Sequence, residues 1–286
     1  MKRIRRFLTP VLLVIFLFSC AMVIQLRRQE RTAAGAYENA AAVAELTPVP
    51  RVLAAQISPA NEELPPIPYR DGFIADSNAS MLLGVDIEAL QAVNEDVLGW
   101  ILIPGTPISY PLLQGDDNQH YLNYTWNGWE SPVGAIYMEC KNDPGLEDFN
   151  TLIYGHYLYD GSMFAGLHEY KDQQFLEEYP YIYLVNETGA YRYRIYGAKE
   201  VTTRDLAYML GVKSQEHKEL FIENSLSGNR LQSGVLPTAE DRILTLSTCT
   251  GYDASRRWVV QAVLEGMIKA PEGETPYPGE AVGLDA

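Results

Sequence analysis

The chain has 286 residues, of which 47% are hydrophobic and 21% are charged, and its formal net charge is −15. This length is enough for one domain of about 200 residues or for two small ones. Seven basic residues and a single acidic one lie in residues 1–31, so the rest of the chain is strongly acidic. An acidic body argues against nucleic-acid binding, which requires basic patches. The three cysteines exclude a disulfide scaffold.

Residues 7–26 are apolar and almost uncharged. As a helix, this stretch would span about 30 Å, the thickness of the hydrocarbon core of a bilayer. The very short N-terminus and the large acidic C-terminal part predict a signal anchor, with residues 1–6 cytoplasmic and the body extracellular. The expected location is therefore the cell membrane, crossed once. A cleaved signal peptide and a lipoprotein attached through Cys20 are the alternatives.

Residues 27–80 are typical of a spacer. The Ala-rich part, residues 27–45, favours a helical stalk, and residues 47–68 contain six prolines, which favour an extended segment. A segment without regular structure is the alternative. Residues 271–286, rich in proline and glycine near their start, predict a disordered tail. The folded domain is therefore expected over residues 81–270.

This domain is expected to begin with a short amphipathic helix over residues 86–93, with Asp86 as N-cap and Ile87, Leu90 and Val93 on one face. Two further short helices are expected at residues 164–178 and 214–226. Elsewhere the hydrophobic pattern has a period of two. It predicts strands over residues 100–103, 108–113, 134–140, 151–156, 181–185, 190–202, 242–249 and 258–264. Many short strands at regular spacing predict a mainly β fold, a closed or nearly closed barrel.

A cysteine ends the penultimate strand. Cys249 is followed by a short polar loop, and the last apolar strand begins directly after Arg256 and Arg257. A thiol reacts as its thiolate, which a nearby histidine or arginine favours. Because side chains alternate along a strand, Ser247 shares the face of Cys249. The same pattern would also fit an inert buried cysteine beside a surface arginine.

One of the four histidines, His156, closes a strand. Tyr154 lies on the same face of that strand, and Gly155 leaves its backbone open to close approach. A histidine can protonate a leaving amine and later activate an incoming one. An arginine can neutralise the oxyanion of a tetrahedral intermediate. Cys249, His156 and one arginine would fill all three roles.

The other histidines carry weaker indications. His168 and His217 lie in polar helical patterns and are expected to be solvated surface residues. His120 lies in a predicted helix and has no obvious partner. No metal site is expected, because the cysteines and histidines lack the spacing of metal ligands.

The segment Thr245-Leu-Ser-Thr-Cys249 resembles the TLxTC motif of sortases, the membrane-anchored cysteine transpeptidases of Gram-positive bacteria. The resemblance to class B sortases covers about residues 82–268. The matching segments are residues 94–103, 108–111, Gln114 with Asp117 and Asn118, 134–138, 153–156 and 160–164. Residues 164–180 fit the extra helix of that class only loosely. The resemblance implies a closed sortase-type β-barrel with an N-terminal helix, and no cofactor.

The resemblance also implies roles for single residues. Carried over by position, Cys249 is the nucleophile, His156 the general acid/base, and Arg257 the residue that stabilises the oxyanion and the substrate. Arg257 is preferred to Arg256 because it directly precedes the last apolar strand. Tyr154 and Ser247 are implied as substrate-wall residues.

The chain departs from the family pattern at Glu139-Cys140, where the family often has Asp followed by an aromatic residue. We expect Cys140 to be a small buried hydrophobic residue. A disulfide between Cys140 and Cys249 is not expected, because it would extinguish activity.

By resemblance, the enzyme would cleave a C-terminal sorting motif after Thr and form a thioacyl intermediate at Cys249. The implied partners are surface proteins or pilins that carry such a motif, and a lipid-linked peptidoglycan precursor whose amine accepts the acyl group. A pilin lysine is the alternative acceptor. Two other functions stay open: a hydrolytic cysteine peptidase on the same fold, and a surface binding domain that has lost catalysis.

Overall fold

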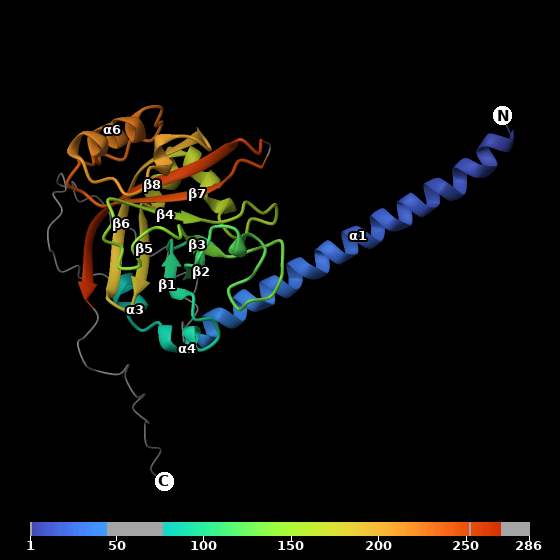
Figure 1. The fold of residues 1–286 in the computed structure, drawn as a ribbon, viewed down its shortest axis with the longest axis horizontal. Helices are drawn as coiled ribbons and strands as arrows, with labels where there is room; N and C mark the ends of the chain where they lie inside the picture. Colours follow the sequence, from blue (N-terminus) through green and yellow to red (C-terminus); the bar gives the residue numbers. More distant parts are fainter. Residues whose placement is uncertain (1, 45–76, 252, 270–286) are drawn as a thin grey trace, which may run out of the picture.

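The computed structural model describes the backbone of residues 2–44, 77–251 and 253–269, and within the first of these ranges the side chains of residues 14–25 and 33–44. In this part of the chain, eight strands form a closed barrel in the order β1-β2-β3-β4-β7-β8-β6-β5. Figure 1 shows the barrel with the long helix α1 (Lys2–Val43) extending away from it. The predicted mainly β, closed-barrel fold is confirmed.

The strands are β1 (Val97–Leu102), β2 (Ser109–Leu113), β3 (Ile136–Met138), β4 (Asn150–Tyr154), β5 (Tyr181–Asn186), β6 (Gly189–Thr202), β7 (Ile243–Cys249) and β8 (Arg256–Lys269). The other helices are α3 (Ser77–Leu82), α4 (Ile87–Gln91), η1 (His120–Leu122), η2 (Ala165–Lys171), α5 (Gln173–Glu178), η3 (Leu206–Tyr208) and α6 (Gln215–Leu226). Every predicted strand corresponds to one of these. The helix expected over residues 164–178 consists of two short pieces, η2 and α5.

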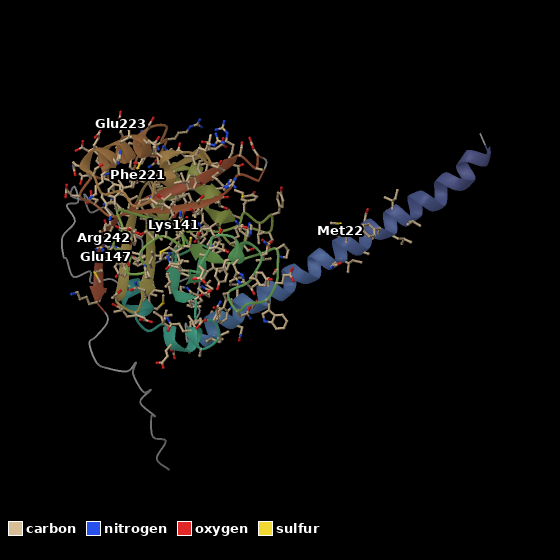
Figure 2. The ribbon with its side chains drawn as sticks, in the orientation of Figure 1. Met22, Lys141, Glu147, Phe221, Glu223 and Arg242 are labelled. Carbon is tan, nitrogen blue, oxygen red and sulfur yellow. The ribbon has the colours of Figure 1, made fainter. Side chains whose placement is uncertain are left out.

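The period-two pattern of β7 separates the two faces of the barrel wall. Leu244 and Leu246 belong to the apolar cluster that also holds Val260 and Ala262 of β8. The alternate residues of β7, Thr245 and Ser247, are also buried, so this part of the wall is covered on both faces. The ion pair of Arg242 with Glu147, 2.7 Å apart, lies next to the start of β7 (Figure 2).

β7 has one neighbour of each orientation. It pairs in parallel with β4 and antiparallel with β8. The side chain of Asn150, the first residue of β4, donates hydrogen bonds to the carbonyls of Ala207 and Met209, both at 3.1 Å, and accepts one from Thr245 at 2.8 Å. These bonds tether η3, which belongs to the β6–β7 connection, to the wall.

The C-terminal part of α1 packs on the barrel. Ala33, Ala40 and Ala44 are buried. Trp126 donates its Nε1–H to the carbonyl of Ala36 at 2.8 Å, and the hydroxyl of Tyr37 donates to the carbonyl of Gly134, just before β3, at 2.5 Å. The helix expected in the stalk is thus present over residues 27–43. The spacer prediction did not include these contacts with the barrel.

The predicted membrane span, residues 7–26, lies within α1. Its described large apolar side chains, such as Phe18, are exposed. Figure 2 shows Met22 on the part of α1 that extends away from the barrel. Among the residues whose side chains are described, no helix is both long and apolar enough to cross a bilayer. The side chains of residues 7–13 and 26 lie outside this set, as do the proline-rich segment and the tail predicted to be disordered.

The helix predicted over residues 86–93 is present as the shorter α4. Asp86 caps α4 as expected, accepting a hydrogen bond from the backbone N–H of Ala89 at 2.8 Å. Ile87 and Leu90 are buried, but Val93 is 50% exposed. The helix ends at Gln91, so Val93 leaves the apolar face that a longer helix would have continued.

Candidate active site

Cys249 and Arg257 are cross-strand neighbours. Cys249 is the last residue of β7, and the antiparallel register places it directly opposite Arg257 of β8. Directly opposite residues on paired strands point to the same face, with Cβ atoms about 5 Å apart. Both residues are half-buried.

The adjacent arginine has a different environment. Arg256 is exposed, and its guanidinium lies 3.6 Å from the carboxylate of Glu200 on β6. Since side chains alternate along β8, Arg256 faces away from Cys249. The Nη1 of Arg257 donates to the backbone carbonyls of Ala254 and Arg256, at 2.7 and 2.9 Å. These bonds attach its guanidinium to the loop that joins β7 to β8.

His156 follows the end of β4, the other neighbour of β7. The parallel register pairs Tyr154 with Ser247, and the backbone N–H of Gly155 donates to the carbonyl of Ser247 at 3.1 Å. His156 and Cys249 are each two residues beyond this pair. The thiol therefore has the histidine strand on one side and the arginine strand on the other.

The imidazole of His156 has a defined hydrogen-bond partner. Its Nε2 lies 2.8 Å from the carbonyl oxygen of Leu122. A carbonyl only accepts, so Nε2 carries a proton, and Nδ1 is the basic nitrogen of the neutral ring. Gly134 lies against this ring with φ +62°, and an added Cβ there would come within 2.8 Å of the His156 Cδ2. The close approach expected at Gly155 is also present, because a Cβ there would lie 2.4 Å from Ile136 Cδ1.

The two predicted substrate-wall residues lie side by side, but their polar groups are already bonded. The hydroxyl of Tyr154 donates to the carboxylate of Glu139 at 2.9 Å. The Oγ of Ser247, which is buried, lies 2.8 Å from the hydroxyl of Tyr208. Burial raises the pKa of Tyr208 to about 12, and burial followed by the Glu139 charge raises that of Tyr154, so both phenols stay protonated near neutral pH.

The sequence reasoning missed three residues beside this wall: Tyr137, Glu139 and Tyr208. Tyr137 pairs with Tyr154 in the β3–β4 register, with ring centroids 5.4 Å apart. Glu139 is buried and also accepts a hydrogen bond from Asn118 at 2.8 Å. Alternation within β4 could not indicate Tyr137, because Tyr137 lies on β3 and the pattern does not say which strands are neighbours. Tyr208 lies in a segment without a periodic pattern.

Cys140 differs from its prediction. It is half-exposed rather than buried, and its Sγ donates a weak hydrogen bond to the carboxylate of Glu139 at 3.5 Å. Desolvation and that hydrogen bond raise the pKa of the thiol, which makes it a poor nucleophile. Cys20, Cys140 and Cys249 are all free thiols.

The remaining histidines divide into three cases. His217 is exposed on α6, as predicted. His120, in η1, stacks on Tyr124 with ring centroids 4.2 Å apart. The prediction for His168 is wrong: this residue is half-buried, and its Nε2 lies 2.9 Å from the backbone carbonyl of Cys249. The polar pattern of its helix concealed this contact. Within the described chain, no three His, Cys, Asp or Glu residues are grouped to hold a metal ion.

Comparison with known proteins identifies the family. The sortase domain model matches residues 101–265. Sortase B of Staphylococcus aureus (strain NCTC 8325 / PS 47) is 34% identical over 177 residues, which are 61% of this chain and 72% of that protein. A crystal structure of sortase B complexed with triglycine is 33% identical and has a TM-score of 0.59, covering 64% of this chain and 86% of that one. A Staphylococcus aureus sortase B–substrate complex is 26% identical, with a TM-score of 0.65, covering 85% and 100%. The chain therefore belongs to the sortase family of cysteine transpeptidases, and it resembles the class B members.

Proposed function

We propose that this sortase cleaves a C-terminal sorting motif after Thr and transfers the protein to an amine, with Cys249 as the nucleophile. The observation that carries this proposal is the position of Cys249 between the His156 strand and its register partner Arg257. A thiolate beside a guanidinium and an imidazole has the two neighbours that acyl transfer requires.

In the first half-reaction, the thiolate of Cys249 attacks the carbonyl carbon of the Thr residue. The carbonyl oxygen becomes an oxyanion, whose charge Arg257 offsets. The intermediate collapses when the C–N bond breaks, and His156, which enters this step as the imidazolium, gives its Nδ1 proton to the leaving amine while Nε2 stays bonded to Leu122. A thioester between Thr and Cys249 remains.

In the second half-reaction, an incoming amine attacks the thioester. His156, now neutral, takes a proton from that amine, an amide bond forms, and Cys249 leaves as a thiolate. The proposed acceptors are an amine of a lipid-linked peptidoglycan precursor and, as an alternative, a pilin lysine. The complex of a related sortase B with triglycine supports an amine acceptor.

Transfer and hydrolysis differ in their products. We expect peptides with Thr at the scissile position, incubated with triglycine, to yield a product in which triglycine is joined to Thr and which replaces most of the free acid. Mass spectrometry of reactions with and without triglycine measures this ratio. An unchanged yield of free acid in saturating triglycine would favour the hydrolytic peptidase instead, and no cleavage of any peptide would favour a binding domain.

We also propose that residues 7–26 anchor the enzyme in the cell membrane, with the barrel outside. The support is the apolar sequence itself, because burial of each large apolar side chain contributes about 1.5–3 kcal/mol. The full chain should float with phospholipid vesicles, and a chain that lacks residues 2–26 should stay at the bottom of the gradient. Equal recovery of both chains with the vesicles would refute the anchor.

A further inference from the structure

His168 contacts the end of β7, the strand that carries Cys249, but it is not one of the three proposed catalytic residues. It lies on η2, which follows the His156 loop, and its Nε2 is 2.9 Å from the backbone carbonyl oxygen of Cys249. β7 ends at Cys249, and a loop begins at the next residue. The bond therefore attaches the peptide group that follows the nucleophile to a separate element of the fold.

The tautomer of His168 follows from its two partners. The ammonium of Lys171 lies 3.2 Å from Nδ1, and it can only donate. The carbonyl of Cys249 can only accept, so Nε2 carries the proton. The imidazole is thus neutral, with Nδ1 accepting from Lys171 and Nε2 donating to Cys249.

Aromatic contacts fix the plane of the His168 ring. The ring lies 4.7 Å from that of Tyr157 and 5.6 Å from that of Trp258, measured between centroids. Trp258 is the neighbour of Arg257 on β8, and its Nε1–H donates to the carbonyl of Leu167 at 2.8 Å. The ammonium of Lys171 lies 5.0 Å from the Trp258 ring. His168 is therefore packed between the loop after β4 and the start of β8.

The surroundings favour the neutral ring. Burial is the largest influence and lowers the pKa of His168; the hydrogen bond to Cys249 opposes it, and the charge of Lys171 adds to it. The titratable and charged groups around the ring are Lys171 and Glu169 on η2, Glu200 on β6, Arg256 paired with Glu200, and the phenol of Tyr157. Cys249 contacts the ring through its backbone carbonyl. Protonation would put a second cation beside Lys171 and remove its acceptor. The contact of Nδ1 with Lys171 is thus present at neutral pH and is lost as pH falls through the lowered pKa, whereas Nε2 keeps its proton and can still donate to Cys249.

We propose that neutral His168 is a positioning residue, which holds the end of β7 so that the Cys249 thiol stays opposite Arg257. This inference rests on the proposed role of Cys249. His168 does not touch the reacting atoms, and it acts through one hydrogen bond to the nucleophile's own carbonyl. Displacements of the order of 1 Å at a catalytic group can lower rates by about 100-fold. Loss of this one hydrogen bond can therefore lower the reaction rate, although His168 is not itself a catalytic residue.

Two substitutions distinguish the contribution of the N–H donor of His168 from that of its packed ring. His168→Gln keeps an N–H donor without a titrating ring, whereas His168→Phe keeps a ring on Trp258 without the donor. We expect His168→Phe to lower kcat/KM about tenfold, a fraction of the loss that a full 1 Å displacement can cause, and His168→Gln to stay within about twofold. His217→Gln and His217→Phe, on exposed α6, are the matched controls and should match the wild type.

Two pH-dependent measurements distinguish positioning from a general structural role. His168→Gln should keep a larger share of its neutral-pH activity at pH 5 than the wild type, because protonation of His168 repels Lys171 on the same helix and loosens η2, whereas glutamine does not titrate. Alkylation of Cys249 by iodoacetamide is followed by peptide mass spectrometry across a range of pH. The pH profile of its rate should shift to higher pH in His168→Phe and stay unchanged in His168→Gln and in the His217 controls. The alkylation rate needs no substrate, so it tests this inference even if no transfer activity is found.

The inference fails if His168→Phe matches the wild type in both kcat/KM and alkylation profile. It also fails if His168→Gln is as impaired as His168→Phe, since the donor would then be irrelevant. Should His168→Phe not fold, the acid limb of His168→Gln decides: an acid limb identical to that of the wild type would overturn the proposal.

Discussion

Cys249→Ala is expected to lower kcat/KM for peptide cleavage by at least about 10⁴-fold, the scale seen when the nucleophile of a covalent mechanism is removed. No other described thiol can replace it. Cys140 is half-exposed, but desolvation and its hydrogen bond to Glu139 raise its thiol pKa. The remaining activity should not increase with added triglycine, because no thioester forms.

The matched control is Cys140→Ala, which removes the same atom from the segment that follows β3. We expect it to leave kcat/KM within about twofold, because a half-exposed side chain contributes little packing. Initial rates measured by chromatography, with the thermal unfolding midpoint of each variant, give the comparison. Comparable losses in the two variants would mean that Cys249 is not the nucleophile.

The second large effect concerns the two adjacent arginines. Arg257→Ala should lower kcat by about 10²–10³-fold, the cost of losing one oxyanion partner. Arg256→Ala should leave kcat nearly unchanged, because it removes only the exposed ion pair with Glu200. Such a pair contributes about 1 kcal/mol or less to the stability of the fold. The register is the reason, since it places Arg257 opposite Cys249 and turns Arg256 to the other face.

Arg256→Ala is the matched control for Arg257→Ala, because the substitution is identical and the two sites are adjacent in the sequence. kcat and KM are measured separately for each variant, and the loss in Arg257→Ala should appear in kcat. Arg257→Lys should recover only part of the rate, since an ammonium lacks the planar pair of donors. A larger loss in Arg256→Ala than in Arg257→Ala would overturn the assignment.

The barrel could be predicted because its strands carry their own signal. In β7 the apolar residues Leu244 and Leu246 alternate with Thr245 and Ser247, and both the strand and its two faces follow from that alternation. The proximity of Tyr154 and Ser247 followed from the same rule only after a family resemblance had been found. Alternation places residues on a face, but it does not say which strands are neighbours.

The errors arose where tertiary contacts override a local pattern. His168 lies in a polar segment that resembles a solvated helix, and only the docking of η2 beside β8 brings it to Cys249. Cys140 was expected in a strand, but β3 ends at Met138, which leaves Cys140 half-exposed. The packing of Tyr37 and Ala40 on the barrel could not be inferred either, because an Ala-rich helix has no pronounced apolar face.

The account depends most directly on a covalent intermediate at Cys249. Full-length enzyme incubated without amine acceptor, with peptides that carry a scissile Thr, should gain the mass of the acyl fragment. Fragmentation of a tryptic digest should place this mass on the peptide that contains Cys249, and triglycine should remove it. Turnover of the peptide with no adduct on Cys249, together with an adduct on Cys140 or undiminished activity in Cys249→Ala, would contradict the account.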